Sequence, residues 1–445
     1  MLRRMVNALT IAGSDSVGGA GLQADLKAFE ALGVHGCAVV TCVTSQNTKG
    51  VSSIHAIPES EVAAQLRSVL EDVKLGAVKT GMLYSADIVK TVAGMLRRVD
   101  APLVVDPVMV ATTGSSLHQS GFVEAIISKI LPQSALVTPN LLEASRLSGI
   151  EIRDERTAKS AAEEILELGP KAVLIKGGHL RGPEAADFLL VNRKWTRFSS
   201  PRMNVDVHGT GCTFASLIAG NLAKGKGLEE AIKISKGIIY KAILARESVG
   251  KGVPCVNPLA VLRIEAGKHA MLSELEDAGS ALEKLLGPDL IPEVGVNMGY
   301  AVLGALEPEE VAALEGRIIR VGKSARKMGC ARFGASKHVA RIVLAASSHD
   351  PQARCAMNMK YSPENLAACR KAKLSVSTFD RSKEPKGVSS MTWGVHRAIE
   401  DFGRVPDAIF DLGGHGKEPM IRLLGRTPDD VIAKLRRIRS RKSSR

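Results

Sequence analysis

Short apolar runs alternate with helix-like stretches along the first half of the chain. Candidate strands are the runs 7–12, 36–43, 77–80, 103–105, 135–138 and 172–175. Between them, apolar residues recur at helical spacing in the stretches 22–32, 86–97 and 141–147. Strands that alternate with helices form βαβ units, so we expect an α/β domain with a mostly parallel sheet. Residues 187–195 and 197–202 then predict a β-hairpin.

Polar side chains follow these strands, at the positions where open α/β sheets bind ligands. They are Gln46, Lys79, Asp106, Asn140, Glu143 and Lys176. Any single carboxylate of this set is equally well explained as a surface cap or an ion-pair partner. Because the carboxyl ends of parallel strands meet at one edge of a sheet, the whole cluster predicts a ligand site there.

The clearest local motif is a glycine turn, Gly209-Thr210-Gly211-Cys212, that opens into a helix with apolar residues at 214, 217, 218 and 222. Unpaired N–H groups at a helix start form an anion site, suited to a phosphate or to the charge that develops in phosphoryl transfer. A thiol at this position is expected to have a lowered pKa, so Cys212 is a candidate acceptor for the proton of an attacking hydroxyl. The alternative is an ordinary helix start with a small buried cysteine.

Residues 13–21 form a second glycine-rich turn. Residues 19–24 fit the dinucleotide-binding pattern GxGxxA, but the strand 36–43 is followed by Thr44-Ser45-Gln46-Asn47 and not by an acid. No GK[ST] follows either, which excludes a Walker A loop. The turn is therefore a flexible backbone able to approach a ligand closely, or a plain connection between strand and helix.

The pattern changes after Glu247. Residues 248–258 are rich in Gly and Pro and predict a linker, and residues 269–286 predict an amphipathic helix. We expect a second, smaller α/β domain over about 265–445. Its candidate strands are 317–321, 353–359, 374–378 and 408–411, and its candidate helices are 336–346 and 393–402.

The chemistry-bearing groups of this second region are basic. Arg317, Arg320 and Arg332 precede His338, which stands at the start of a predicted helix. Residues 411–419 combine a strand end, a glycine loop and Lys417, an arrangement that cradles phosphates elsewhere. A solvated basic face is the alternative for the arginines, and a capping or core residue is the alternative for the histidine.

Composition narrows the class of protein. A chain of 445 residues implies two or three domains, and 3% aromatic residues leave little for stacking on nucleic-acid bases. Half of the net charge of +14 lies in residues 434–445, read as a solvated helix end, so the excess favours phosphorylated small molecules over nucleic acid. The chain has seven cysteines without a CxxC pair, which favours a reducing cytoplasm over a disulfide framework or zinc site. We expect no membrane span, since no apolar run approaches roughly 20 residues.

The first region resembles the hydroxymethylpyrimidine/phosphomethylpyrimidine kinases, a branch of the ribokinase fold. AGSD, GGAG, QADLK, TSQNT, KTGML, DPVM, TPN, IKGGH and HGTGCTF occur in family order over residues 5–255. Val17 departs from the family's glycine run. The resemblance implies a three-layer ribokinase-like domain over 1–258 that phosphorylates hydroxymethylpyrimidine, and then its phosphate, with ATP. A kinase of pyridoxal or of a sugar is the alternative.

The resemblance also implies roles for individual residues. Gln46 would bind the aminopyrimidine, because an amide both donates and accepts hydrogen bonds. The same pocket would include Gly13, Asp15 and Met82. Cys212 stands where most ribokinase relatives carry an aspartate, and would be the general base.

The phosphate side of the site follows from the same resemblance. The anion hole would be formed by Gly209, Thr210 and Gly211, and Lys176 would approach the ATP phosphates. The residues expected near Mg²⁺, partly through water, are Asp106, Asn140 and Glu143.

The second region resembles the ThiN-type thiamine-phosphate synthase domain through GRIIRVGK, RFGASKH, NMKYSPEN, FDRSKEP and FDLGGHGKEPM. Lys360 stands where that family often has Arg. The resemblance implies that residues 259–445, a linker and this domain, couple the pyrimidine pyrophosphate to thiazole phosphate. The expected catalytic residues are Arg317, Arg320 and His338, with Arg332 and Lys417 binding substrate. A non-catalytic, ligand-sensing domain is the alternative. We expect a cytoplasmic homo-oligomer, such as a dimer, that takes small-molecule substrates.

Overall fold

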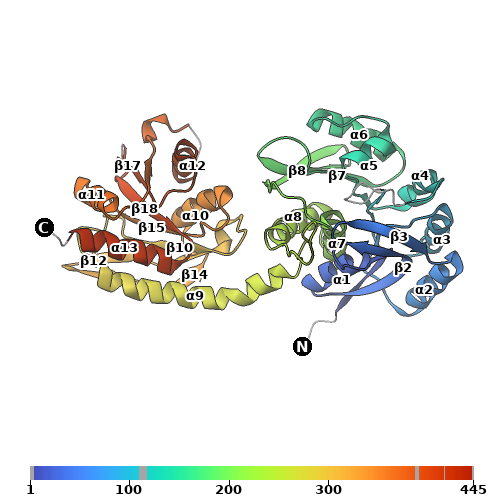
Figure 1. Cartoon of the computed structure of the whole chain (residues 1–445), viewed down its shortest axis with the longest axis horizontal. Helices are drawn as coiled ribbons and strands as arrows, with labels where there is room; N and C mark the ends of the chain where they lie inside the picture. Colours follow the sequence, from blue (N-terminus) through green and yellow to red (C-terminus); the bar gives the residue numbers. More distant parts are fainter. Residues whose placement is uncertain (1–4, 110–117, 386–389, 415, 443–445) are drawn as a thin grey trace. The chain divides into compact units, whose positions relative to one another are not determined.

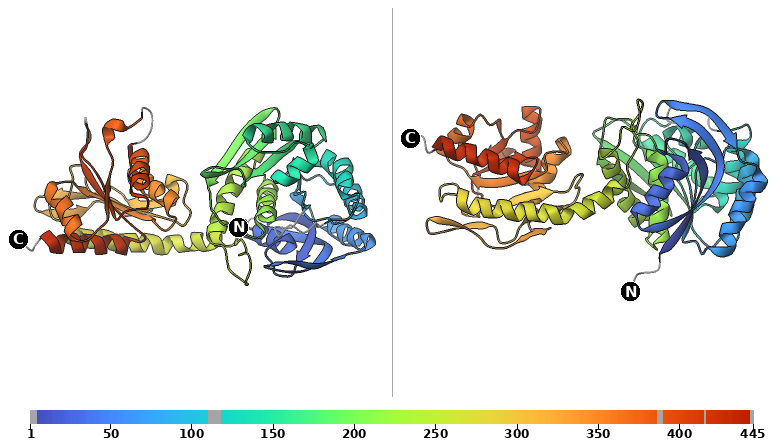
Figure 2. Two further views of the ribbon diagram at one scale, coloured as in Figure 1. Left: turned by 45° about the horizontal axis from the view of Figure 1, so that its top comes forward. Right: turned by 60° about the horizontal axis from the view of Figure 1, so that its bottom comes forward.

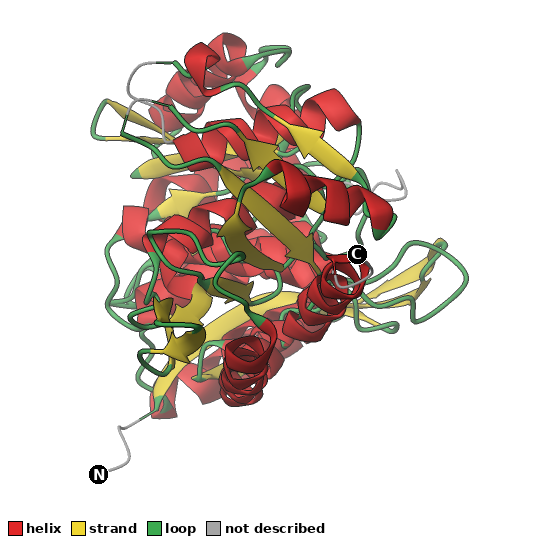
Figure 3. Cartoon of the chain, turned by 90° about the vertical axis from the view of Figure 1, so that its left-hand side faces the viewer, coloured by secondary structure: helices red, strands yellow, loops and turns green. Residues whose placement is uncertain are grey.

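The protein consists of two compact units, Met1–Leu262 and Arg263–Arg445 (Figure 1). The computed structural model describes residues 5–109, 118–385, 390–414 and 416–442. Both units mix helices and strands (Figure 3). Among the described residues, none of the helices has the length and apolar character that a membrane crossing requires.

The first unit is built on a nine-stranded sheet with the order β3-β2-β1-β4-β5-β6-β7-β8-β9. The strands are β1 Val6–Asp15, β2 Val34–Asn47, β3 Gly50–Ala56, β4 Ala77–Thr80, β5 Leu103–Val105, β6 Leu136–Val137, β7 Ala172–Gly177, β8 Glu184–Val191 and β9 Lys194–Pro201. Pairing is parallel from β2 through β1 to β7, and antiparallel only at the edges, where β3, β8 and β9 join. The predicted mostly parallel sheet is confirmed.

Helices cover both faces of this sheet. One layer contains α1 Gly21–Ala31, α7 Thr210–Ala223 and α8 Leu228–Leu244, and the other α2 Glu59–Asp72, α3 Ala86–Leu96, α4 Phe122–Ala125, α5 Leu141–Ser148 and α6 Glu155–Glu167. Successive side chains of a strand point to opposite faces. Accordingly Ala8 packs in the core under α1 and α7, whereas Leu9 and Ile11 pack in the core under α2 and α3. This is the expected three-layer arrangement.

The Gly/Pro-rich segment 248–258 is not the free linker that its composition predicted. The backbone N–H of His208 donates to Pro254 O (2.8 Å), and Val256 N–H donates back to His208 O (3.1 Å). Gly252 N–H donates to Thr48 Oγ1 (2.9 Å). The segment is therefore a strap on the first unit. The following helix α9, Ala260–Leu285, starts well before residue 269 and contains the boundary between the units; it is the long yellow helix of Figure 2.

The second unit has a seven-stranded sheet in the order β14-β11-β10-β15-β18-β17-β16, and a separate hairpin of β12 and β13. The strands are β10 Met298–Ala301, β11 Val311–Leu314, β12 Ile318–Val321, β13 Ser324–Lys327, β14 Ala331–Phe333, β15 Cys355–Lys360, β16 Val376–Thr378, β17 Ala408–Asp411 and β18 Met420–Gly425. Among the strands that the structure describes in this unit, only β16 and β17 pair in parallel. The second, smaller α/β domain is confirmed, but its sheet is mainly antiparallel and includes β10, β11 and β18, which the pattern did not reveal.

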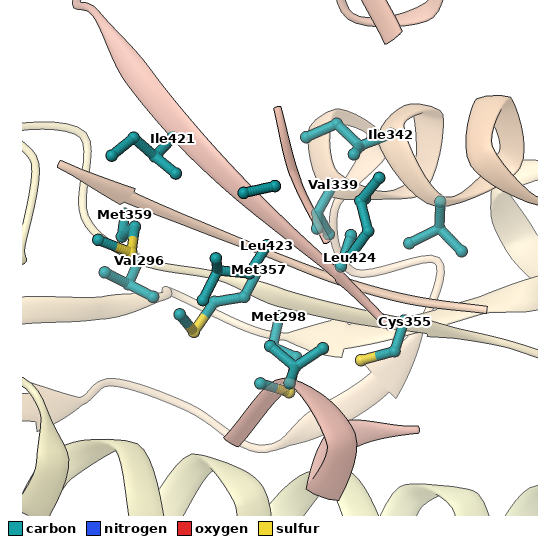
Figure 4. Close-up of a cluster of buried hydrophobic side chains, with 14 of the residues drawn as sticks. Val296, Met298, Val339, Ile342, Cys355, Met357, Met359, Ile421, Leu423 and Leu424 are labelled. Atoms are coloured by element: carbon teal, nitrogen blue, oxygen red, sulfur yellow. The ribbon is translucent and has the colours of Figure 1, made fainter. Parts of the chain in front are cut away.

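Two layers of helices enclose this second sheet. They are α10 Lys337–His349, α11 Pro363–Lys371, α12 Ser390–Phe402 and α13 Pro428–Lys442, together with α9. Val339 of α10 lies over Gly299 of β10, on the sheet face that also carries Leu424 of β18, whereas Met357 and Leu423 point to the opposite face (Figure 4).

The basic C-terminal stretch is more than a solvated helix end. Helix α13 buries Val431, Leu435 and Ile438 in the same core. Arg439 Nη1 donates to Leu285 O (2.5 Å). Much of its positive charge is thus the outer face of a structural helix; residues 443–445 lie outside the described range.

Candidate functional sites

The predicted anion turn lies at the carboxyl edge of the first sheet. Helix α7 begins after Gly209, whose φ of 83° is left-handed. A methyl group on Gly209 would lie 1.7 Å from Gly19 O, so glycine is needed for the turns 18–21 and 209–211 to touch. The N–H groups of Thr210, Gly211 and Cys212 have no partner within the helix, as at any helix start. A methyl group on Gly211 would lie 3.2 Å from Lys176 Nζ, which places that ammonium at the turn.

The thiol of Cys212 differs from the expectation for a helix N-terminus. Burial raises its pKa to about 12, and the nearby carboxylates of Asp106 and Asp25 add to that effect. The charge of Lys79 and a backbone hydrogen bond from Gly21 lower the pKa but do not compensate. The prediction of a lowered pKa was wrong because it considered the helix and not the burial.

Two ion pairs underlie the turn: the Lys79–Asp25 pair is fully buried, whereas Lys176 keeps 13% of its side chain exposed beside the buried Asp106. Lys176 Nζ lies 2.7 Å from Asp106 Oδ1, and Lys79 Nζ lies 2.8 Å from Asp25 Oδ2. Burial opposes ionisation of Asp106, but Lys176 and Lys79 outweigh it and hold the pKa of that carboxyl below its ordinary value. Asp25 also accepts from Ser216 Oγ (2.7 Å). The QADLK and KTGML stretches therefore supply a buried pair whose partnership the sequence did not reveal.

Asn140 and Glu143 form the N-terminal capping box of α5. Glu143 N–H donates to Asn140 Oδ1 (2.9 Å), and Asn140 N–H donates to Glu143 Oε2 (2.8 Å). Glu143 is nonetheless buried, and that burial raises its pKa to about 7 against the pull of Lys176, with the Asp106 charge adding to the rise. The capping alternative therefore holds for both residues, and Glu143 also interacts electrostatically with Lys176 and Asp106.

These side chains suit an indirectly held Mg²⁺ ion. Within the described ranges, no three His, Cys, Asp or Glu side chains gather as a metal cluster. Mg²⁺ usually takes only one or two carboxylates and completes its shell with water and phosphate oxygens. Asp106 and Glu143 interact electrostatically beside the anion turn, so the donor set fits a nucleotide-bound ion.

A polar triad lies at the ends of β1 and β2. His208 Nε2 lies 3.0 Å from Asp15 Oδ2 and 2.9 Å from Gln46 Nε2. Burial opposes ionisation of Asp15, but His208 and the N–H groups of Val17 and Ala20 lower its pKa. The sequence placed Asp15 and Gln46 in one pocket but missed His208, although this residue opens the HGTGCTF stretch.

The wall beside this triad is apolar. A methyl group on Gly13 would lie 2.7 Å from Cys42 Sγ and 3.4 Å from Met82 Sδ. Cys42 and Met82 are buried and pack with Tyr84 and Val108. A flat ring has here both an apolar face and polar groups for its edge.

The second unit has an open pocket of about 270 Å³ at the start of α10. Its lining residues are Asn297, Leu314, Gly316, Arg317, Ala335, Ser336, Lys337 and His338. Arg317 adopts a left-handed φ of 66°, which is costly for a residue with a Cβ and recurs at functional sites. The pocket therefore combines the first N–H groups of α10 with the cationic side chains of Lys337 and Arg317, groups that are able to bind an anion.

His338 faces several arginines. Desolvation and the charges of Arg422, Arg317 and Arg381 lower its pKa to about 4. Because His338 remains exposed to solvent, desolvation contributes less to this lowered pKa. Repulsion by the arginines is therefore its main cause. The imidazole is therefore neutral at pH 7.

The other predicted residues of this unit lie apart from the pocket lining. Arg320 is exposed on β12, opposite Ala325. Arg332 on β14 forms an ion pair with Glu315 (2.6 Å), and Lys417 forms one with Glu384 (3.2 Å). Sequence spacing grouped Arg320 and Arg332 with Arg317 because it could not foresee the hairpin of β12 and β13 that separates them.

Sequence reasoning also missed a buried charge cluster. Arg381 and Arg422 both pair with Asp411, at 2.5 Å and 2.7 Å. FDRSKEP and FDLGGHGKEPM contain two of these residues, but Arg422 lies alone in an apolar strand. Only the strand pairing brings the three together.

Comparisons with known proteins identify both units. A phosphomethylpyrimidine kinase family model matches residues 15–257, and a thiamine-phosphate synthase ThiN model matches residues 274–437. The bifunctional thiamine biosynthesis protein ThiDN of Methanocaldococcus jannaschii is 35% identical over 428 residues, 96% of this chain and 97% of that protein.

Two further relatives cover the first unit. A hydroxymethylpyrimidine/phosphomethylpyrimidine kinase of Streptomyces coelicolor is 46% identical over 55% of this chain and 91% of its own length. The structure of pyridoxal kinase from Staphylococcus aureus with AMP-PCP and pyridoxal is 33% identical, with a TM-score of 0.55 over 59% of this chain and 96% of that one. Identity is thus higher to the pyrimidine kinase than to the pyridoxal kinase. The chain belongs to the bifunctional thiamine biosynthesis proteins that join a phosphomethylpyrimidine kinase to a ThiN-type thiamine-phosphate synthase.

Proposed function

We propose that the first unit transfers phosphoryl groups from ATP to hydroxymethylpyrimidine and then to its phosphate. The observation that carries this proposal is the junction of the anion turn, Cys212 and Lys176 at the sheet edge. The pyrimidine ring would lie against Met82 and Gly13, with its polar edge at Gln46 and its hydroxymethyl group toward Cys212.

In this mechanism Cys212 acts as the thiolate. The substrate hydroxyl attacks the terminal phosphorus of ATP, its proton passes to the sulfur, and ADP leaves. Because the pKa of the thiol is about 12, only a small fraction is thiolate at pH 7. Lys79 is the cation that increases this fraction, and it acts against burial and against the charges of Asp106 and Asp25.

Lys176 would leave Asp106 for the phosphates when ATP binds, while the turn N–H groups stabilise the transferring group. Asp106, Asn140 and Glu143 would hold Mg²⁺, mostly through water. When bound, this ion neutralises charge on the phosphate oxygens.

We propose that the second unit joins the pyrimidine pyrophosphate to thiazole phosphate. The thiazole nitrogen forms a bond to the pyrimidine methylene carbon, and the bond from that carbon to pyrophosphate breaks. Arg317, Lys337 and the start of α10 would neutralise the leaving group. As the anion offsets the arginines, His338 would take a proton and hold the departing pyrophosphate.

The test uses the whole protein. It is incubated with hydroxymethylpyrimidine, ATP, Mg²⁺ and thiazole phosphate, and mass spectrometry follows thiamine phosphate. We expect product only when all four components are present. A parallel assay with pyridoxal compares the kinase substrates. If the pyrimidine pyrophosphate accumulates and thiazole phosphate binds but is never consumed, the second unit is a ligand sensor.

The setting of the enzyme is also a proposal. We propose that the enzyme is cytoplasmic. Its similarity to a thiamine biosynthesis protein and its seven free cysteines support this location. We further propose a homodimer. Light scattering during gel filtration measures the mass against the 47.2 kDa of one chain.

A further inference from the structure

A row of buried polar side chains crosses the second sheet. Asn358 of β15 lies directly opposite Arg422 of β18. Asn358 Oδ1 accepts from the N–H of Asn297 (2.8 Å), and Asn358 Nδ2 donates to Gly295 O (2.9 Å). Residues directly opposite in an antiparallel pair project from the same face. Since Asn297 lines the pocket at α10, the row leads from that pocket to Arg422.

Arg422 is fully buried and incompletely paired. Its Nη2 lies 2.7 Å from Asp411 Oδ2, and its guanidinium lies 5.4 Å from the ring of Phe379. None of its Nε, Nη1 and Nη2 atoms has a hydrogen-bond partner among the described residues, so the contact with Asp411 is an ion pair without a hydrogen bond. Buried ion pairs are seldom more stabilising than well-packed apolar side chains, so a guanidinium here calls for an explanation other than stability.

Asp411 links this charge to the glycine turn that follows β17. It accepts from Arg381 Nε (2.5 Å) and Nη2 (3.1 Å), and its Oδ1 accepts from Gly413 N–H (2.8 Å). One carboxylate therefore serves two guanidinium groups and leaves one positive charge unbalanced within the cluster. The turn itself needs Gly413, with φ of 79°, because a methyl group there would lie 2.6 Å from Lys417 O.

The unbalanced charge acts on the pocket. Among the charges that lower the pKa of His338, Arg422 has the largest effect, ahead of Arg317 and Arg381. Arg341 on α10 contributes the same sign. The polar row and this electrostatic effect both connect Arg422 to the pocket, although no pocket-lining atom belongs to it.

We propose that Arg422 is a positioning residue that holds a fixed positive charge behind the phosphate pocket of the second unit. Asp411 fixes its guanidinium and, through the same carboxylate, the guanidinium of Arg381 and the glycine turn. The ligand is a phosphoryl or pyrophosphoryl group bound at Arg317, Lys337 and the start of α10. A charge that is held before the ligand arrives stabilises the anion without reorganisation.

This inference rests on the proposed synthase function. It attributes the affinity of the second unit for anions in part to the charge of Arg422. Either substrate phosphate fits the chemistry: the pyrophosphate of the pyrimidine or the monophosphate of the thiazole. Titration of the whole protein with inorganic pyrophosphate and, separately, with thiazole phosphate distinguishes the two.

The experiment compares Arg422→Met, Arg422→Gln and Arg422→Lys with the matched control Arg426→Met, an exposed arginine just beyond the same strand. We expect Met and Gln to weaken binding of one or both anions at least about tenfold, and Lys to restore most of it. Kinase turnover is a property of the first unit and should be unchanged in every variant. It serves as a control that the first unit of each variant is folded and active. Calorimetry gives the affinity, and thermal unfolding gives the stability.

The outcomes separate the possibilities. Unchanged affinity for both anions in Arg422→Gln overturns the inference, and so does a loss that Arg422→Lys fails to restore while unfolding is unaffected. If Arg422→Met does not fold, the Gln and Lys pair decides alone. Failure of the proposed function has another signature, because the unmodified protein would then bind the anions but yield no thiamine phosphate.

Discussion

The two proposed phosphate sites of this chain balance their charge in different ways. In the first unit each buried cation has its own carboxylate, Lys176 with Asp106 and Lys79 with Asp25. In the second unit Arg381 and Arg422 share the single carboxylate of Asp411. The first arrangement is neutral within its pairs, and the second carries excess positive charge.

This difference matches the chemistry proposed for each site. A nucleotide that arrives with its metal ion brings countercharge, so neutral pairs and backbone N–H groups are sufficient to hold it. A pyrophosphate leaving group gains charge as its bond breaks, and fixed arginines stabilise that gain. The comparison therefore predicts how substitutions act at each site. In the first site, the loss of activity should depend on which single group is removed. In the second site, the loss of anion binding should depend on the total positive charge that remains.

The largest expected effect is on phosphoryl transfer. Cys212→Ala should lower kinase turnover by about 10²–10⁴, the usual cost of removing a general base. ATP binding should remain, and Cys212→Asp should recover part of the rate. Cys37→Ala is the matched control, since Cys37 is a free cysteine of the same unit. Near-normal turnover of Cys212→Ala would make this cysteine structural.

The buried pair beneath Cys212 is next. Lys79→Met leaves the carboxylate of Asp25 buried and unpaired, so the first unit should lose about 3–5 kcal/mol in its free energy of unfolding. The double change Lys79→Met and Asp25→Leu should recover most of that stability but not the kinase rate, because the cation that favours the thiolate is gone. A double variant with full activity would remove Lys79 from the mechanism.

Gln46 tests recognition of the pyrimidine. Gln46→Ala should raise KM for hydroxymethylpyrimidine far more than for ATP, because a buried ring amine would lose a partner at a cost of about 1–3 kcal/mol. Steady-state kinetics with each substrate varied in turn measures the two values. Equal increases for both substrates would indicate a folding role, through the contact of Gln46 with His208.

The smallest effect concerns His338 and pH. With a pKa of about 4 in the folded protein, His338 binds fewer protons between about pH 4 and 6.5 than it does in the unfolded chain. Stability of the second unit should therefore fall as pH drops through this window and be unaffected above it. His338→Gln should flatten the fall, as should saturating pyrophosphate. Equal pH dependence in His338→Gln and the unmodified protein would contradict the assignment.

The sequence predicted which residues lie together at the edge of the first sheet, because the rules that it relied on are local. A glycine turn before a helix, and polar residues after parallel strands, converge wherever the sheet is parallel. Gly209 and Lys176 accordingly lie together. The prediction failed where burial mattered, since the pKa of Cys212 depends on side chains from distant strands.

The second site was harder to predict from the sequence, because its residues are brought together by the register of antiparallel strands. Asn358 and Arg422 are paired only by β15 and β18, and Arg422 looks like an isolated charge in an apolar strand. His208 was missed in the first unit because its partner Asp15 is 193 residues away in the sequence. The strap at 248–258 was read as a linker because Gly and Pro mark irregular backbone whether or not it packs.

The central claim is that one chain completes two successive reactions at two separate, differently charged sites. The most direct test mixes full-length Cys212→Ala with full-length Arg317→Ala and supplies hydroxymethylpyrimidine, ATP, Mg²⁺ and thiazole phosphate. We predict that neither variant alone forms thiamine phosphate, that added pyrimidine pyrophosphate restores only Cys212→Ala, and that the mixture forms product. Product from either variant alone at the rate of the unmodified protein, or none from the mixture when each retains its other activity, would contradict the account.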